Sequence, residues 1–200
     1  MLKSILVGLD GSIYCPAAIQ LAINWSQVTQ AEVVGLGIID QPGITTPSAA
    51  PMAPGHLKEE RDQALLSDAE RQTNQFLEQF SLACTKAGVP SKVLQEFGSP
   101  DREILEESQR YDVVLLGKET FFKFETHEGA DATLQTVVKT SPRPVVVVPE
   151  SLPSGKNVVV AYDGSVQAAR ALQLFVLSGI PCSGEVHVVS IHENKIIAAK

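Results

Sequence analysis

One phrase occurs twice in this chain, and each copy ends an apolar run with Asp-Gly-Ser. Residues Ile5–Ser12 read ILVGLDGS, and Val158–Ser165 read VVVAYDGS. The likeness continues at the same spacing, without a gap, through the segment that follows each copy. A repeat at a fixed offset indicates a duplicated folding unit. We therefore expect a complete unit over residues 1–150, a linker over 151–156 and part of a second unit over 157–200.

Short apolar runs alternate along the chain with segments of helical periodicity. The runs expected to be strands cover 5–9, 32–39, 92–97, 113–116 and 145–148, followed by 158–162 and 186–191. The segments expected to be helices cover 17–28, 56–87, a stretch opened by Ser99-Pro100-Asp101, 132–140 and 168–177, and the proline-rich stretch 41–55 is expected to be a loop. This alternation predicts an α/β fold, in which a doubly wound parallel five-stranded sheet carries helices on both faces, plus a partial second copy.

Composition excludes several classes of protein. The net charge of −7 disfavours nonspecific binding to nucleic acid or to an anionic membrane. No apolar run approaches the roughly 20 residues that span a bilayer, and the N-terminus lacks the pattern of a signal peptide. The cysteines at 15, 84 and 182 are far apart, without metal-ligand spacing. We expect a cytoplasmic protein with reduced thiols, no metal site, and neither nucleic acid nor membrane as a partner.

Small and acidic residues follow the predicted strands. Asp10 follows the first strand, and Gly117 ends the fourth. Ligands of such sheets bind beyond the carboxyl ends of the strands, so these residues are candidates for a binding site. Asp10 either binds a ligand or is a turn residue whose side chain caps the next helix. Gly117 either admits a phosphate group or only ends its strand.

Taken together, the motifs resemble the universal stress protein family in its tandem form. The resemblance rests on ILVGLDGS, on the run FGSPDREILEESQRYDVVLLG and on SPRPVVVVP, and it covers nearly all of residues 1–150. It implies an adenine-nucleotide-hydrolase-like fold, a possible ATP site with Mg²⁺ at the strand C-termini, and a homodimer as the expected assembly.

The resemblance also assigns roles to individual residues. On the adenine and ribose side it implies Asp10, Gly11, Ser12, Ile38 and Gly117. On the phosphate side it implies Thr120 and the start of the next helix, at Ala132 and Thr133.

The phosphate loop of the family is altered in this chain. The family has a glycine after the fourth strand, a second glycine soon after, and a Gly-Ser or Gly-Thr pair at the next helix start. Such glycines let phosphates approach main-chain N–H groups. Gly117 is kept, but Thr120 takes the second position and Asp131-Ala132 take the pair. A carboxylate there would repel a triphosphate, whereas Gly129 could supply a substitute cradle if the loop shifts.

Three functions stay open on this evidence. The first is a stress-response regulator whose association depends on an adenine nucleotide, and the second is a nucleotide-free dimeric interaction protein of the same fold. The third is a slow ATPase, which would have to act by positioning because no catalytic residue is evident. Within the altered loop, Phe121, Phe122 and Phe124 either pack it onto the protein or cover a ligand.

Overall fold

The computed structural model describes residues 2–46, 55–155, 157–182 and 184–190. The chain divides into two compact units. The larger unit covers Lys3–Leu152, and the smaller unit contains the first two residues and the chain from Pro153 onward. None of the helices described is both long and apolar enough to cross a membrane.

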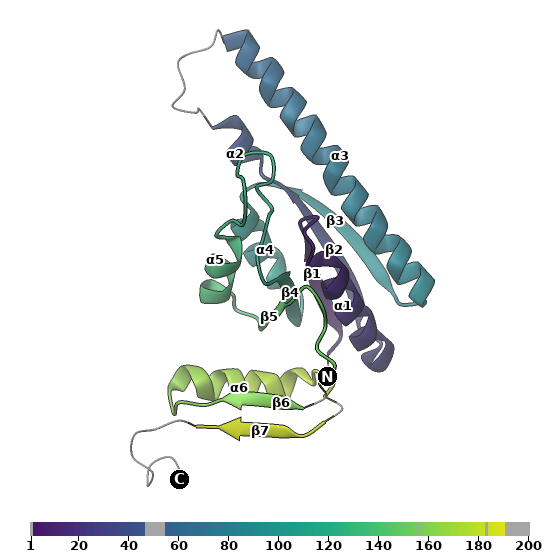
Figure 1. The fold of residues 1–200 in the computed structure, drawn as a ribbon, viewed down its shortest axis with the longest axis vertical. Helices are drawn as coiled ribbons and strands as arrows, with labels where there is room; N and C mark the ends of the chain where they lie inside the picture. The colour runs from purple at the N-terminus through teal and green to yellow at the C-terminus, as the bar shows by residue number, and fades with distance from the viewer. Residues whose placement is uncertain (1, 47–54, 156, 183, 191–200) are drawn as a thin grey trace. The chain divides into compact units, whose positions relative to one another are not determined.

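A single parallel sheet forms the centre of the larger unit, with strand order β3-β2-β1-β4-β5 (Figure 1). The strands are β1 Ser4–Leu9, β2 Glu32–Ile39, β3 Ser91–Phe97, β4 Val113–Gly117 and β5 Val145–Val148. β1 pairs with β2 along one edge and with β4 along the other, so the strand order reverses beside β1. Because β1, β2 and β4 are buried almost throughout, their continuous apolar sequence is explained. The predicted doubly wound sheet is confirmed.

Helices cover both faces of this sheet (Figure 1). They are α1 Cys15–Thr29, α2 Gln41–Thr45, α3 Gly55–Ala87, α4 Pro100–Ser108 and α5 Thr133–Thr140. Helices α1 and α3 contact each other and the strands β1 and β2, whereas α4 contacts α5. In each of α1 and α4, a proline lies in the first helical turn, where its missing N–H is not needed.

Helix α2 corrects the prediction of a loop over 41–55. Asp40 caps the helix, because its side chain accepts a hydrogen bond from the Gly43 N–H at 3.1 Å. Pro42 fits the first turn of α2 for the reason that holds in α1. The prediction of a loop is therefore wrong for residues 41–45, because a proline is also compatible with the first turn of a helix. Residues 47–54 of the predicted loop lie outside the described part.

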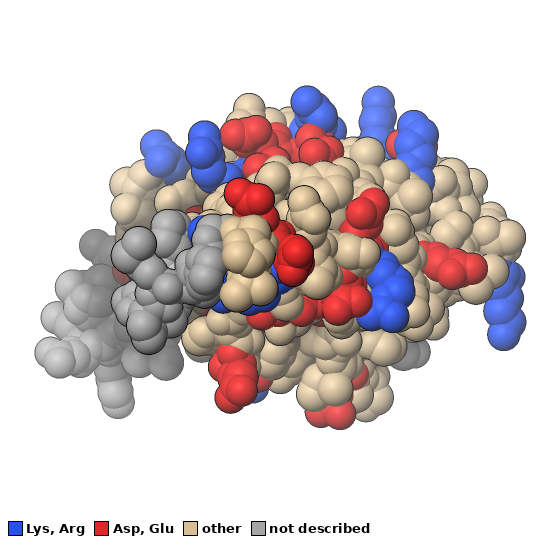
Figure 2. Space-filling model, turned by 90° about the horizontal axis from the view of Figure 1, so that it is seen from above, with Lys and Arg blue, Asp and Glu red and all other residues tan. Residues whose placement is uncertain are grey.

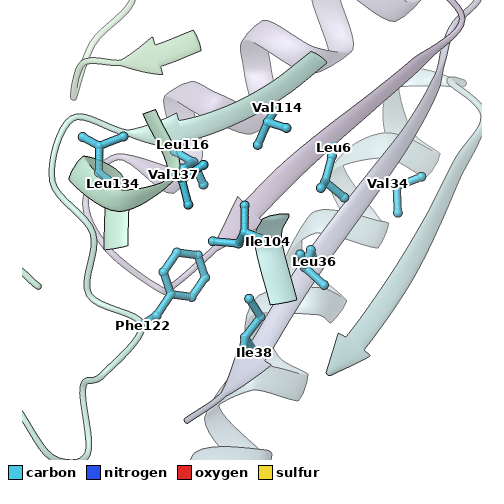
Figure 3. Packing of buried hydrophobic residues seen from close by; sticks show 10 residues of the cluster. All are labelled: Leu6, Val34, Leu36, Ile38, Ile104, Val114, Leu116, Phe122, Leu134 and Val137. Carbon is cyan, nitrogen blue, oxygen red and sulfur yellow. The ribbon is translucent and has the colours of Figure 1, made fainter. Parts of the chain in front are cut away.

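One hydrophobic cluster fills the space between the sheet and the α4–α5 layer (Figure 3). Its buried members are Leu6, Val34, Leu36, Ile38, Ile104, Val114, Leu116, Phe122, Leu134 and Val137. Nine of these ten residues come from strands and helices, whereas Phe122 comes from the loop between β4 and α5. Figure 3 shows its ring pointing in among the aliphatic side chains. This loop is therefore part of the core.

The smaller unit contains a parallel strand pair and one helix. These elements are β6 Val158–Ala161, α6 Val166–Ser178 and β7 Val186–Val189. The predicted strand over 186–191 ends earlier, at Val189, and residue 191 lies outside the described residues. The repeated phrase makes the same turn twice, because Asp163 accepts the Ser165 N–H at 2.9 Å just as Asp10 accepts that of Ser12 at 3.0 Å. A second unit of the same family stays a prediction.

Candidate functional site

The predicted site residues lie at the edge of the sheet where β1, β2 and β4 end. The loop over residues 118–131, which we call the closing loop, crosses this edge between β4 and α5. Its two ends are joined by an isolated bridge, in which the Asp131 N–H donates to the Thr120 carbonyl at 2.7 Å. The contacts of this loop determine what the site can bind.

Asp10 fastens the closing loop to β1. Its Oδ2 accepts the Phe121 N–H at 2.7 Å, and its Oδ1 accepts the Ser12 N–H at 3.0 Å and the Cys15 Sγ at 3.1 Å. The residue is only 6% exposed. Asp10 is thus a turn residue, but it does not cap α1, whose N-cap Tyr14 has no side-chain cap bond. Both carboxylate oxygens are directed to protein donors.

Cys15 shares this environment. Burial, reinforced by the nearby carboxylate of Asp10, raises the pKa of its thiol to about 12. The thiol is therefore protonated at neutral pH and acts as a hydrogen-bond donor.

The two glycines predicted to approach a ligand are closely approached by other parts of the protein. Gly11 has a φ of +73°, and a Cβ there would overlap the Phe76 ring. A Cβ on Gly117 would lie 2.8 Å from the Tyr14 Cβ and 2.8 Å from the Glu119 carbonyl oxygen. Tight packing against Phe76 and Tyr14 therefore accounts for both glycines.

Asp131 occupies the start of α5, where the resemblance implied a phosphate. Its Oδ1 accepts the Thr120 hydroxyl at 2.7 Å and the Thr133 N–H at 2.9 Å. Its Oδ2 accepts the Lys123 N–H at 3.2 Å. The residue is 7% exposed. A negatively charged group is favourable at a helix N-terminus, and here the protein supplies that group itself.

The remaining phosphate-side residues surround Asp131. Thr120 is 1% exposed, and its hydroxyl also accepts the Leu134 N–H at 3.3 Å. Ala132 is the N-cap of α5 and makes no side-chain cap bond. The Thr133 hydroxyl is buried and has no partner among the residues described. The residues predicted to bind phosphate thus lie together, but the Thr120 hydroxyl and the Thr133 N–H already donate to Asp131.

Phe122 fills space in the cluster that contains Ile38. It is 2% exposed and belongs to the same buried cluster as Ile38, the residue implied to meet adenine. A Cβ on Gly8 of β1 would lie 3.0 Å from the Phe122 ring, so this glycine makes room for the ring. The hollow beside the ring, lined in part by Asp40 and Ile44, is too narrow for a water molecule.

Two further contacts hold the closing loop against α3. The Phe124 ring meets the Phe76 ring edge-on, with centroids 6.1 Å apart. Gln72 donates to the Glu125 carboxylate at 2.8 Å. Phe122 and Phe124 therefore pack the loop onto the protein, as one of the two predicted alternatives has it.

Charged side chains of both signs lie at this end of the larger unit. Figure 2 looks onto the molecule from above and shows acidic and basic side chains interspersed. Lys118 and His127 of the closing loop are exposed, as expected for a solvated loop. Within the described ranges, no group of three or more His, Cys, Asp or Glu could hold a metal ion.

Some partners in this network were not foreseen from the sequence. Nothing in the sequence pointed to the Phe121 N–H or to Cys15 as partners of Asp10. Asp131 did carry a signal, because it stands at a position where the family pattern has glycine. The sequence indicated that a ligand would be repelled there, but not that the carboxylate takes the ligand's hydrogen bonds.

Known proteins of one family are similar to this chain in sequence and fold. A model of the "Universal stress protein family" matches residues 1–149. Universal stress protein Slr1230 of Synechocystis sp. is 30% identical over 83 residues, which are 40% of this chain and 28% of that relative. The chain thus matches little more than a quarter of the length of this curated relative.

Solved structures agree on the fold. A universal stress protein from Archaeoglobus fulgidus DSM 4304 superposes with a TM-score of 0.67 at 20% identity, covering 96% of this chain and 67% of that one. A universal stress protein family protein from Arabidopsis thaliana, solved with AMP bound, has a TM-score of 0.51 at 17% identity, covering 76% of this chain and 96% of that one. Since the family model spans most of the sequence, this chain belongs to the universal stress protein family.

Proposed function

We propose that this universal stress protein acts through protein contacts, as a cytosolic homodimer in a stress response, without requiring a bound adenine nucleotide. The observation that carries the proposal is the burial of Phe122 in the cluster of Ile38, the residue that the resemblance assigns to adenine. A ring held there would fill the adenine side of the family's site from within the chain. Catalysis is not part of the proposal, because the carboxylate oxygens of Asp10 and Asp131 accept hydrogen bonds from the protein and the Cys15 thiol donates to Asp10.

The contact between the Phe122 ring and its cluster is part of the hydrophobic core. Removing the Phe122 ring from its cluster would expose apolar surface of Ile38, Leu116 and their neighbours. A nucleotide would need to displace this ring as well as the bond from the Phe121 N–H to Asp10. Both costs would be subtracted from its affinity.

A nucleotide-dependent switch is the second candidate. It is favoured by the structural neighbour from Arabidopsis thaliana, which was solved with AMP bound. In this case, the closing loop would open and Asp10, Ile38 and the start of α5 would take the ligand. ATP with Mg²⁺ is the form that the family resemblance implies.

Calorimetry separates the two candidates. The gently purified chain is titrated with ATP and with AMP, each with and without Mg²⁺, and the same preparation is denatured and assayed for released nucleotide. We expect no heat of binding up to millimolar ligand and no released nucleotide. Micromolar binding, or nucleotide released in near-equal amount to protein, would reject the proposal in favour of the switch.

The dimer is tested separately. Sedimentation equilibrium of the nucleotide-free protein should give twice the chain mass of 21.5 kDa. A monomer at micromolar concentration would remove the dimer from the proposal.

A further inference from the structure

We infer that Asp131 is a built-in substitute for an oxyanion: its carboxylate occupies an anion site at the start of α5 and keeps external phosphate out. This inference rests on the proposed function, since both treat the site as closed from within. It names the residue that prevents anion binding and the hydrogen bonds by which that residue does so.

The hydrogen bonds match those of a bound oxyanion. Donors come from three separate points of the chain, namely the Thr120 hydroxyl, the Lys123 N–H and the Thr133 N–H, and converge on one carboxylate. Two of them are main-chain N–H groups, and one of these begins a helix. Main-chain donors of this kind bind phosphate or sulfate when no side chain intervenes.

A second observation points to an unfilled role at the same place. The Thr133 hydroxyl is on a residue only 3% exposed, and it has no hydrogen-bond partner among the residues described. Buried hydroxyl groups are nearly always paired. A planar carboxylate has two acceptor oxygens, whereas a phosphate has more, so an oxyanion in place of Asp131 could also accept this hydroxyl.

The framework of the site does not depend on the carboxylate. The bridge between residues 120 and 131 is made by main-chain atoms, because the Asp131 N–H donates to the Thr120 carbonyl at 2.7 Å. Phe122 anchors the middle of the loop independently in the hydrophobic cluster. Removing the side chain at 131 should therefore vacate the site while the donors stay close to their positions.

A tethered carboxylate is a strong competitor. A group held next to its site has an effective concentration in the millimolar range or higher. External phosphate must exceed that value to replace it, and its own charge is repelled until the carboxylate leaves. Deleting Asp131 should therefore strengthen phosphate binding at least tenfold.

The test uses inorganic phosphate as the probe and Asp131→Gly as the variant. Binding is followed by the chemical shifts of the Thr133 and Lys123 amides and by the rise in Tm with phosphate concentration. Asp101→Gly is the matched control, because it removes an acidic residue from the first turn of α4, another helix that follows a strand of the same sheet. Asp131→Ser is the second variant, in case glycine loosens the loop.

Support requires that Asp131→Gly or Asp131→Ser bind phosphate at least tenfold more tightly than the parent chain, with shifts centred on Thr133, while Asp101→Gly does not. If phosphate binds as an adventitious ion only, the parent and the three variants will all bind it weakly and equally. That result would overturn the inference. Folded variants at 131 that gain nothing would also overturn it. None of these results depends on whether the parent binds ATP, so failure of the proposed function is recognised separately.

Discussion

Replacing Phe122 with alanine tests whether the closing loop is core or a detachable lid. The ring is 2% exposed and belongs to one cluster with side chains from β1, β2, β4, α4 and α5. Truncating a fully buried phenylalanine costs about 3–5 kcal/mol, which includes both the lost transfer energy and the cavity. The upper part of this range applies if the aliphatic neighbours on the rigid sheet cannot collapse into the space.

This cost predicts a clear change in melting temperature. For a chain of this size, about 1 kcal/mol corresponds to roughly 2–4 °C, so Phe122→Ala should lower the Tm by about 6–20 °C. Urea denaturation followed by circular dichroism would give the free energy of unfolding directly, provided that the m-value is unchanged. The value should be read from the transition of the larger unit.

Phe121→Ala is the matched control. The two residues are adjacent, but the Phe121 side chain is only partly buried, and its main-chain N–H to Asp10 is retained in the variant. We expect a loss of about 1 kcal/mol, typical of point substitutions. If Phe122→Ala costs no more than Phe121→Ala, the ring spends much of its time outside the cluster. The reasoning behind the closed site would then be refuted.

Three further predictions concern the carboxylates and thiols around the site. Asp10→Ala should lower the free energy of unfolding by about 2–3 kcal/mol, because the Phe121 and Ser12 N–H groups lose their carboxylate acceptor. The equivalent substitution at the exposed Asp163 should leave the free energy of unfolding nearly unchanged, and equal effects of the two variants in urea denaturation would contradict this. Because the pKa of Cys15 is raised to about 12, iodoacetamide at pH 8–9 should alkylate Cys15 far more slowly than the exposed Cys182. Peptide mapping would measure both rates, and rapid labelling of Cys15 in the folded protein would contradict the prediction. Burial raises the pKa of Asp40 above its usual range, so this carboxyl group should destabilise the fold as the pH rises from the unfolded-state pKa of about 3.9 through the raised folded-state pKa. Asp40→Asn should therefore be more stable than the parent at pH 7, and thermal melts should show that this advantage disappears at pH 3.

The fold was predictable because its signals are local and repeated. After its first residue, each of β1 and β2 is apolar at every position, as a strand with both faces buried must be, and the runs at 5–9 and 32–39 reappear as these two strands. The helix after Asp40 was missed because a proline in the first turn of a helix and a proline in a loop look alike in sequence. What separates them is the bond from the Gly43 N–H to Asp40, which depends on three-dimensional geometry.

The place of the site was also predictable, but its state was not. Asp10 was expected directly after the first strand and Thr133 at the start of the helix that follows the fourth strand, and they lie there. Their partners come from the closing loop, more than 100 positions after Asp10 in the case of Phe121. No periodicity of the sequence links such distant residues.

A carboxylate at position 131, where the family pattern has glycine, can close a phosphate site from within, and this effect is difficult to predict from the sequence. From the sequence alone, aspartate in place of glycine at a phosphate-binding loop predicts that the ligand is repelled. The same carboxylate, once it rotates toward Thr133 and Lys123, satisfies the donors that the ligand would have satisfied. Burial of the Phe122 ring stabilises the fold at all times, whereas a bound base would stabilise it only while it is present. A chain with this closing loop would hold constitutively the conformation that a ligand-dependent relative must obtain by binding.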